Sequence, residues 1–184
     1  PSILGSNSAK PRVTAIVPAF NSGEFIGRTL DSLAAQTWGD LEILVGDDAS
    51  TDDTLQVVRE FAAEHSNVRI VAQEFNLGWV GNSNDLMKRA AGDLFFFAFH
   101  DDLVMPEYVA RLVEAREKNP KAVLAFSDMM LVEGEEQRHQ RVFTALEGVH
   151  GRLSRGIVLA KRPENWWVSI HGLFSASAAH SIGG

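Results

Sequence analysis

Short apolar runs alternate with stretches of helical periodicity through about the first hundred residues, and this alternation limits the fold more than any other feature. The apolar runs have the length and the β-branched or aromatic composition of buried strands: Val13–Val17, Leu41–Val45, Val68–Ala72 and Leu94–Phe99. Buried strands that alternate with helices form parallel sheets covered by helices on both faces. We therefore predict an α/β fold with three layers, α/β/α, around a mostly parallel central sheet.

The segments between these runs predict the helices. Apolar residues between Phe25 and Leu33 recur at helical spacing, and this helix should end near Gln36–Gly39. A second helix is expected at about Asp52–Glu64, with Ser50 opening a capping box. Further elements are predicted as follows: a turn at Asn76–Gly78, helices at Asn84–Ala91 and from Pro106 to about Lys118, and strands at Val123–Phe126 and Met129–Val132.

Composition and charge exclude several classes of protein. The 184 residues are 45% hydrophobic and 22% charged, as in an ordinary globular domain. The formal net charge of -7 argues against a nucleic-acid-binding surface. Because cysteine is absent, disulfides and thiolate chemistry are ruled out, and we expect a cytoplasmic protein.

Two features of the sequence bear on membrane contact: the length of its apolar runs and the position of its basic residues. No apolar run approaches the roughly 18 residues that span a bilayer. The mixed pattern from Arg138 to Arg162 defines no element, but it is locally basic. Its positively charged side chains form either a solvated face or a peripheral contact with anionic lipid: Arg152, Arg155, Lys161 and Arg162.

Chemically suggestive residues follow the predicted strands at their carboxyl ends. They lie in Pro18–Asn21, in Asp47–Asp48 and in His100–Asp102. Ligands of open α/β sheets bind in a crevice beyond the carboxyl ends of the strands. These three loops should therefore converge on one site.

The acidic and aromatic residues of these loops each admit two interpretations. Asp101 and Asp102 suit the start of a helix, or they hold a hard cation such as Mg²⁺ or Mn²⁺ that bridges diphosphate oxygens. The pair Asp47 and Asp48 is either structural or supplies a carboxylate that is able to accept a hydrogen bond from the imide N–H of uracil. Phe20 either stacks on that base or belongs to the core.

Taken in order, these stretches resemble the family-2 glycosyltransferases with a GT-A, Rossmann-like fold. The similarity covers about residues 12–130, with weaker hints at His171–Phe174. The stretches that carry it are Val13–Asn21, Gly46–Thr54, Asn76–Gly78 with Asn84, and Ala91–Leu94 leading to Asp101 and Asp102. The resemblance implies an enzyme that transfers a sugar from a nucleoside diphosphate sugar, UDP being the expected nucleotide, to an acceptor hydroxyl. It also implies inversion at the sugar and assistance by Mg²⁺ or Mn²⁺.

The resemblance assigns a role to each matching position. It implies that Pro18, Phe20 and Glu24 line the nucleotide pocket and that Asp48 reads the base. Asp101 would lie beside the ribose and the diphosphate, and Asp102 would ligate the metal. Asn76 and Gly78 would shape the loop beside the nucleotide.

Two features depart from the family pattern. Phe99 stands where the family often has a further Asp, and the neighbouring His100 is either an additional metal ligand or a loop histidine. The acceptor-side general base is also missing, because the late carboxylate Glu164 does not match the base motif. We expect the base beyond Gly184, and His171 is a weaker substitute.

The expected organisation has three parts. Residues 1–11 form a flexible lead, 12–132 form the nucleotide-sugar-binding domain, and 133–184 begin a truncated acceptor-binding portion. Trp166 and Trp167 either form an apolar platform for a saccharide or lipid-linked acceptor or are buried against the sheet. His171 is assigned to the same acceptor side.

Two rival functions stay open from the sequence. A sugar-phosphate nucleotidyltransferase would need a Gly-rich, basic loop after the first strand, and the loop Pro18–Glu24 contains no Lys or Arg. A nucleotide-sugar-binding module without turnover would keep the pocket and need no base.

Overall fold

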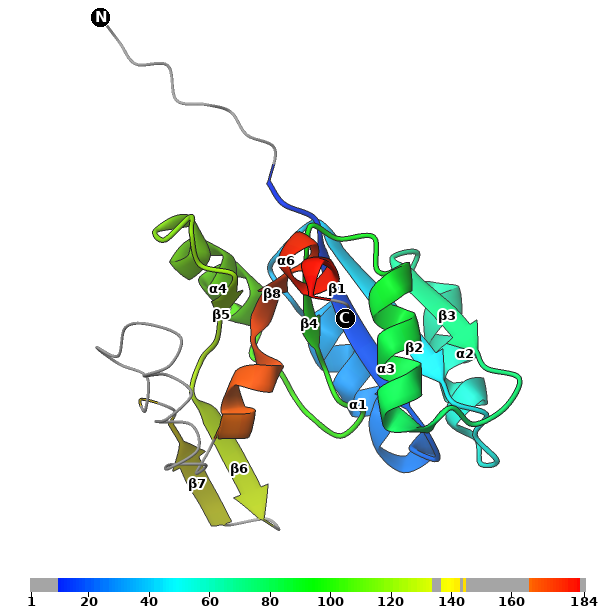
Figure 1. Ribbon diagram of the computed structural model, residues 1–184. Helices are drawn as coiled ribbons and strands as arrows, with labels where there is room; N and C mark the ends of the chain where they lie inside the picture. The colour runs from blue at the N-terminus through cyan, green and yellow to red at the C-terminus, as the bar shows by residue number, and fades with distance from the viewer. Residues whose placement is uncertain (1–9, 134–136, 143, 145–165, 183–184) are drawn as a thin grey trace, which may run out of the picture.

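A six-stranded sheet forms the centre of the computed structural model, which describes residues 10–133, 137–142, 144 and 166–182 (Figure 1). The strands lie in the order β3-β2-β1-β4-β8-β5. Their bounds are β1 Val13–Ala19, β2 Leu41–Asp47, β3 Val68–Ala72, β4 Leu94–Phe97, β5 Leu124–Ala125 and β8 Leu173–Ser175. The pairs β1–β2, β1–β4 and β2–β3 are parallel, whereas β8 is antiparallel to β4 and β5. The predicted mostly parallel central sheet is confirmed.

Helices cover both faces of this sheet and complete the predicted α/β/α layers. Their bounds are α1 Gly23–Ala34, α2 Thr54–Glu64, α3 Gly78–Arg89, α4 Tyr108–Glu117, α6 Ala176–Ser181 and the 3₁₀ helix η1 Trp166–His171. On one face, α1, α2 and α4 contribute Leu30, Val58 and Leu112 to the core. On the other face, α3 contributes Leu86 to a second cluster, which α6 extends with alanines. Because both faces are covered, a ligand can reach this sheet at the ends of its strands.

Strand β1 extends past the predicted Val17 and includes Pro18. The pairing of β1 with β4 ends at Ile16 and Phe97, after which the Ile16 carbonyl accepts from the Ala98 N–H at 2.9 Å. Alternate residues of a strand face the same neighbour, so Pro18 faces the side on which this pairing has ended. The missing N–H of proline therefore leaves no ladder hydrogen bond unmade, and the strand continues to the edge of the sheet.

Helix α3 begins at Gly78, well before the predicted start at Asn84. Gly78 has a φ of 72°, a left-handed conformation that glycine adopts without steric cost. Asn82 and Ser83 are buried, and Asn82 Nδ2 donates to the Gly46 carbonyl at 2.8 Å. These buried polar side chains interrupt the apolar periodicity, which is why the sequence pattern misses the first half of the helix.

The late part of the chain adds two strands that the sequence did not predict, β7 Gln137–Arg141 and β8. β8 lies between β4 and β5, and α6 follows it directly. β6 Met129–Glu133, which confirms the predicted strand there, pairs with β7 Gln137–Arg141 in a separate hairpin (Figure 1). The division of the chain at residue 132 stays a prediction, although the segment that follows it supplies β8 to the central sheet.

Membrane contact stays untested by the fold. Within residues 10–133, 137–142 and 166–182, no helix combines the length and the apolar composition that crossing a bilayer requires. The basic residues considered for a peripheral contact, between Arg152 and Arg162, lie outside the described residues.

The start of α2 lacks the predicted capping box. Ser50 Oγ instead accepts from the Asn21 N–H at 3.0 Å, and Asp53 at the N-cap makes no side-chain cap bond. Asp52 accepts the backbone N–H groups at the helix starts instead: its Oδ1 accepts from the Thr54 N–H at 3.0 Å and its Oδ2 accepts from the Gly23 N–H at 3.1 Å. Asp52 therefore joins the starts of α1 and α2.

We expect Asp52→Ala to lower the free energy of unfolding by about 0.5–1 kcal/mol, as for other capping side chains, and Asp53→Ala to change it little. The hydrogen bond from the Thr54 hydroxyl lowers the pKa of Asp52. A lowered pKa contributes stability above the unfolded-state pKa of about 3.9, and this stability is lost as the pH falls through the folded-state pKa. Urea unfolding at neutral pH and at about pH 3 should show the difference between the variants shrinking in acid. An equal difference at both pH values would contradict this role of Asp52.

Candidate functional site

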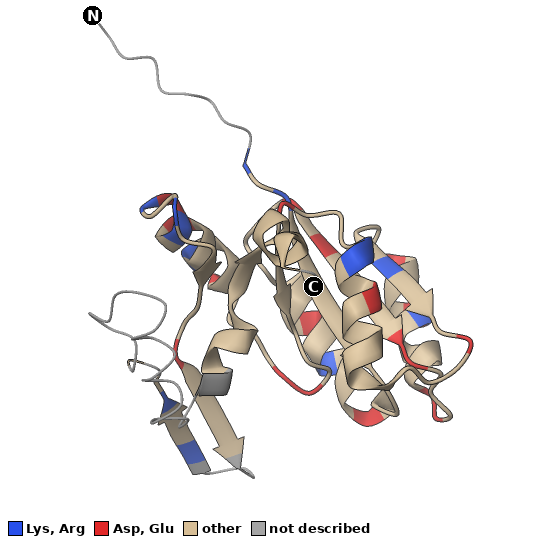
Figure 2. Ribbon diagram, viewed as in Figure 1, with Lys and Arg blue, Asp and Glu red and all other residues tan. Residues whose placement is uncertain are grey.

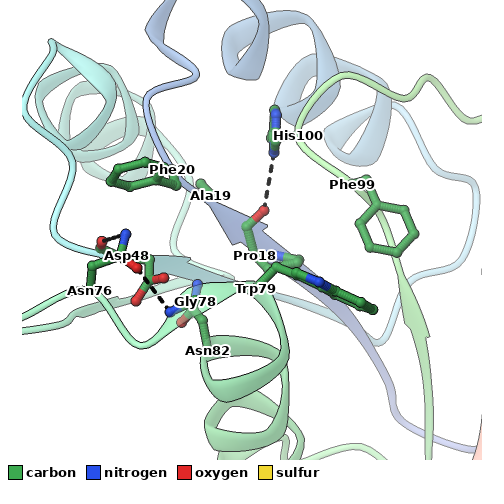
Figure 3. Close-up of a pocket in the computed structure, with 10 residues that line it drawn as sticks. All are labelled: Pro18, Ala19, Phe20, Asp48, Asn76, Gly78, Trp79, Asn82, Phe99 and His100. Atoms are coloured by element: carbon green, nitrogen blue, oxygen red, sulfur yellow. Dashed lines mark hydrogen bonds between the residues drawn. The ribbon is translucent and has the colours of Figure 1, made fainter.

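A pocket of about 400 Å³ lies at the carboxyl ends of β1, β2 and β4 (Figure 3). Four of its lining residues lie in the loops after these strands, two belong to the end of β1, and four come from the loop before α3 and the first turns of α3. The lining residues are Pro18, Ala19, Phe20, Asp48, Asn76, Gly78, Trp79, Asn82, Phe99 and His100. The strand order reverses at β1, which has β2 on one side and β4 on the other, and ligands of open α/β sheets bind at such switch points.

Six of the residues that the sequence places at the site line this pocket: Pro18, Phe20, Asp48, Asn76, Gly78 and His100. Phe20 is 44% exposed, so it belongs to the pocket rim rather than to the core. The Nδ1 atom of His100 lies 3.4 Å from the Pro18 carbonyl oxygen, across the gap between β4 and β1 (Figure 3). The predicted convergence of three strand-end loops is present in the fold.

Asp48 holds the loop before α3 in place. Its side chain is 2% exposed, and Oδ1 accepts from the Leu77 N–H at 2.7 Å. Its backbone carbonyl accepts from Asn76 Nδ2 at 3.1 Å, and Asn76 Oδ1 accepts from the Gly78 N–H at 2.9 Å. The expected role of Asn76 and Gly78 in shaping this loop therefore has a structural basis in the contacts of Asn76 with Asp48 and with Gly78.

The loops after β1 and β2 are tied to each other beside Phe20. Asn21 Oδ1 accepts from the Thr51 N–H at 2.8 Å, and the Asn21 N–H donates to Ser50 Oγ. Asn21 has a φ of 46° and Ala49 a φ of 58°, conformations that cost residues other than glycine of order 1–3 kcal/mol. The surrounding hydrogen bonds hold this strained backbone at the rim of the pocket.

Three of the residues expected at the nucleotide or the metal do not line the pocket. Glu24 is exposed in the first turn of α1, and Asp101 is exposed in the loop that follows β4. Asp102 lies next in this loop, with its Oδ2 3.1 Å from His171 Nε2. The loop from β4 to α4 contains acidic residues and no Lys or Arg (Figure 2).

The described residues contain no group of three or more His, Asp or Glu side chains arranged around a cation site. This does not conflict with the chemistry of magnesium, which takes one or two protein carboxylates and completes its shell with substrate phosphates and water. Asp101 and Asp102 supply hard oxygen donors directly after His100, which lines the pocket. The donor set therefore fits a cation bound together with a diphosphate.

The sequence did not identify three of the pocket residues, Trp79, Asn82 and Phe99, as part of the site. Trp79 and Asn82 lie in the part of α3 that the periodicity did not reveal, and Phe99 was assigned to the end of a strand. Trp79 is 70% exposed. A large aromatic residue directly after the predicted turn at Asn76–Gly78 was the signal that could have found it.

The residues predicted for the acceptor side, Trp166, Trp167 and His171, lie in the 3₁₀ helix η1. The backbone of Trp166 and Trp167 opens η1, so the choice between a platform and burial stays a prediction. His171 ends the same 3₁₀ helix. Glu164, the late carboxylate considered as a base, lies outside the described residues.

A three-layer α/β sheet with a pocket at its switch point is the architecture of nucleotide-binding folds. The sequence matches the family described as glycosyl transferase family 2 over residues 14–172, and the chain belongs to this family. A poly(ribitol-phosphate) beta-glucosyltransferase of Bacillus spizizenii is 32% identical over 111 residues, which cover 59% of this chain and 18% of that protein. The chain spans about half or less of the length of curated relatives that it matches.

Solved structures share the same fold. S. aureus TarS in complex with UDP has a TM-score of 0.73 at 22% identity, covering 93% of this chain and 48% of that one. The mannosyltransferase PcManGT from Pyrobaculum calidifontis, in complex with GDP-Man and Mn²⁺, has a TM-score of 0.70 at 21% identity, covering 96% of this chain and 48% of that one. The predicted GT-A fold is confirmed.

Proposed function

We propose that this chain is the nucleotide-sugar-binding part of a glycosyltransferase whose donor is a UDP-sugar. The observation that carries the proposal is the pocket at the carboxyl ends of β1, β2 and β4, in which Phe20 and Asp48 lie together. An exposed aromatic ring and a buried carboxylate are the two groups that a planar base with an N–H donor requires. Family membership supports sugar transfer as the reaction class.

The base would bind between the loops that follow β1 and β2. Phe20 offers an exposed ring for stacking, and Asp48 Oδ2 would accept the imide N–H of uracil while Oδ1 stays bonded to Leu77. A hydrogen bond to a charged acceptor contributes about 1.5–3 kcal/mol, enough to prefer uracil over cytosine by tenfold or more. TarS, a structural relative, has been crystallised with UDP and with UDP-GlcNAc.

The diphosphate would extend from this base toward the loop after β4, where Asp101 would contact the ribose and the diphosphate. Asp102 would hold a divalent cation, Mg²⁺ or Mn²⁺, which supplies charge neutralisation to the departing diphosphate when bound. Glu24 would reach the nucleotide from the start of α1. These roles follow from position in the loops, since the three carboxylates lie outside the pocket wall itself.

The reaction would be an in-line displacement at the anomeric carbon with inversion. The acceptor, a saccharide or a lipid-linked saccharide, would approach from the side of η1 and present a hydroxyl group. A general base within hydrogen-bond reach would take the hydroxyl proton. We assign this role to a residue outside the described part of the chain.

A nucleotidyltransferase is the less favoured alternative, because the residues that line the pocket include no Lys or Arg to hold a triphosphate. Calorimetric titration with UDP, CDP and GDP, each with and without Mn²⁺, tests the proposal directly. We expect UDP to bind most tightly and Mn²⁺ to strengthen its binding. Equal affinity for all three nucleotides, or release of pyrophosphate from a nucleoside triphosphate and a sugar phosphate, would overturn it.

Trp79 gives a further prediction at the same pocket. We expect Trp79→Ala to weaken UDP binding about fivefold, because a base bound in the pocket would cover part of the exposed indole, and stacking contributes about 1 kcal/mol or more. Trp38→Phe is the matched control, because Trp38 Nε1 donates to the Pro11 carbonyl before β1, at the opposite end of the strand. Quenching of tryptophan fluorescence by UDP should fall in the first variant and persist in the second. Unchanged affinity of Trp79→Ala would remove this residue from the binding site.

A further inference from the structure

The side chains of Asp102 and His171, which are far apart in the sequence, are in contact. Asp102 lies in the loop after β4, and His171 ends η1 just before β8. Their Oδ2 and Nε2 atoms are 3.1 Å apart, and the side chains are 36% and 17% exposed. The late segment of the chain thus brings an imidazole to the carboxylate that the proposed function assigns to the metal.

Neighbouring residues fix the position of His171. The Tyr108 hydroxyl donates to the His171 backbone carbonyl, and the Phe99 ring meets the His171 ring edge to face at a centroid distance of 5.1 Å. β8, which follows His171, is paired on both sides, with β4 and with β5. An imidazole held this firmly is preorganised for a ligand.

Phe99 places this pair beside the nucleotide pocket. The Phe99 ring lines the pocket and also contacts His171, so Asp102 and His171 lie against this side of the pocket wall.

We propose that His171 Nε2 is a second protein ligand of the divalent cation, next to Asp102 Oδ2. The proposal rests on the proposed function, because the cation binds there with the nucleotide. Two adjacent ligands about 2.1 Å from an octahedral ion lie about 3.0 Å apart, close to the separation of these two atoms. An imidazole ligand favours Mn²⁺ and Co²⁺ over Mg²⁺, so the site should bind Mn²⁺ more tightly than Mg²⁺ in the presence of UDP.

Electron spin-echo spectroscopy of Mn²⁺ bound to the protein with UDP tests this contact without relying on activity. We expect nitrogen coupling from a directly bound imidazole, and we expect ¹⁵N labelling of histidine to change its frequency. Bound Mn²⁺ without nitrogen coupling overturns the inference and leaves the nucleotide site standing. If UDP binds but Mn²⁺ does not, the inference fails alone, and if UDP does not bind, the proposed function fails with it.

Three variants identify the histidine that is bound. His171→Gln should lose the nitrogen coupling and weaken Mn²⁺ binding at least about tenfold, with metal-free UDP binding unchanged. His100→Gln removes the histidine that lines the pocket, and His180→Gln removes an exposed one in α6. Both should keep the coupling, and its loss in either of them overturns the assignment to His171, even if His171→Gln does not fold.

Discussion

Replacement of Asp102 by alanine should remove the part of UDP binding that depends on Mn²⁺. The parent chain should bind UDP more tightly with Mn²⁺ than without it, and Asp102→Ala should bind UDP equally in both conditions. The variant loses a hard oxygen donor in a site with few protein ligands. Removing a residue that only contacts a metal ligand already lowers metal affinity 10- to 100-fold, so we expect Asp102→Ala to lower Mn²⁺ affinity at least about 100-fold. Calorimetry with Mn²⁺ titrated into the protein–UDP mixture measures it.

A matched control separates this effect from a change in net charge. Glu107→Ala removes the same charge from the exposed N-cap of α4, where Glu107 makes no side-chain cap bond, and it should leave Mn²⁺ binding unchanged. Metal-free UDP binding should be the same in both variants and in the parent, because Asp102 does not line the pocket. An Asp102→Ala variant that still gains affinity from Mn²⁺ would exclude Asp102 as a ligand.

The main strands could be predicted because burial on both faces makes them uninterrupted apolar runs. The predicted strand at Leu94–Phe99 contains β4, an apolar run whose first three residues are buried. β8 could not be predicted in this way, since it is short and its partners β4 and β5 are distant in sequence. The alternation in such a short strand carries no signal, so its place in the sheet follows from tertiary contacts.

In the candidate site, too, some residues could be predicted from the sequence and others could not. Pro18, Asp48 and His100 could be placed together from the sequence because each lies at or just after the carboxyl end of a parallel strand, and parallel strands end on the same side of a sheet. Trp79 could not, because its position depends on where α3 begins, and the buried polar Asn82 hides that start. The contact between Asp102 and His171 depends on the docking of β8, which local spacing does not encode.

Replacement of Asp48 by asparagine should invert the preference between UDP and CDP. Asparagine keeps an oxygen that can accept from the Leu77 N–H, as Asp48 Oδ1 does at 2.7 Å. Its other terminal atom becomes an NH₂ group, which donates and cannot accept. Uracil presents an N–H at this edge and cytosine presents an acceptor nitrogen. We therefore expect UDP binding to weaken by about 10- to 100-fold, the loss of a hydrogen bond to a charged acceptor, and CDP binding to strengthen.

Asp48→Ala distinguishes the two roles of this side chain. Alanine removes the contact with Leu77 as well as the contact with the base, so it should lower the stability of the fold and weaken both nucleotides without favouring CDP. Parallel calorimetric titrations with UDP and CDP, together with urea unfolding of each variant, measure both effects. If asparagine weakened UDP and CDP equally while preserving stability, Asp48 would act only by holding the loop before α3. A switch toward CDP that occurs with asparagine and not with alanine requires contact between residue 48 and the base. The bond to Leu77 is the same with either nucleotide and so does not produce such a switch.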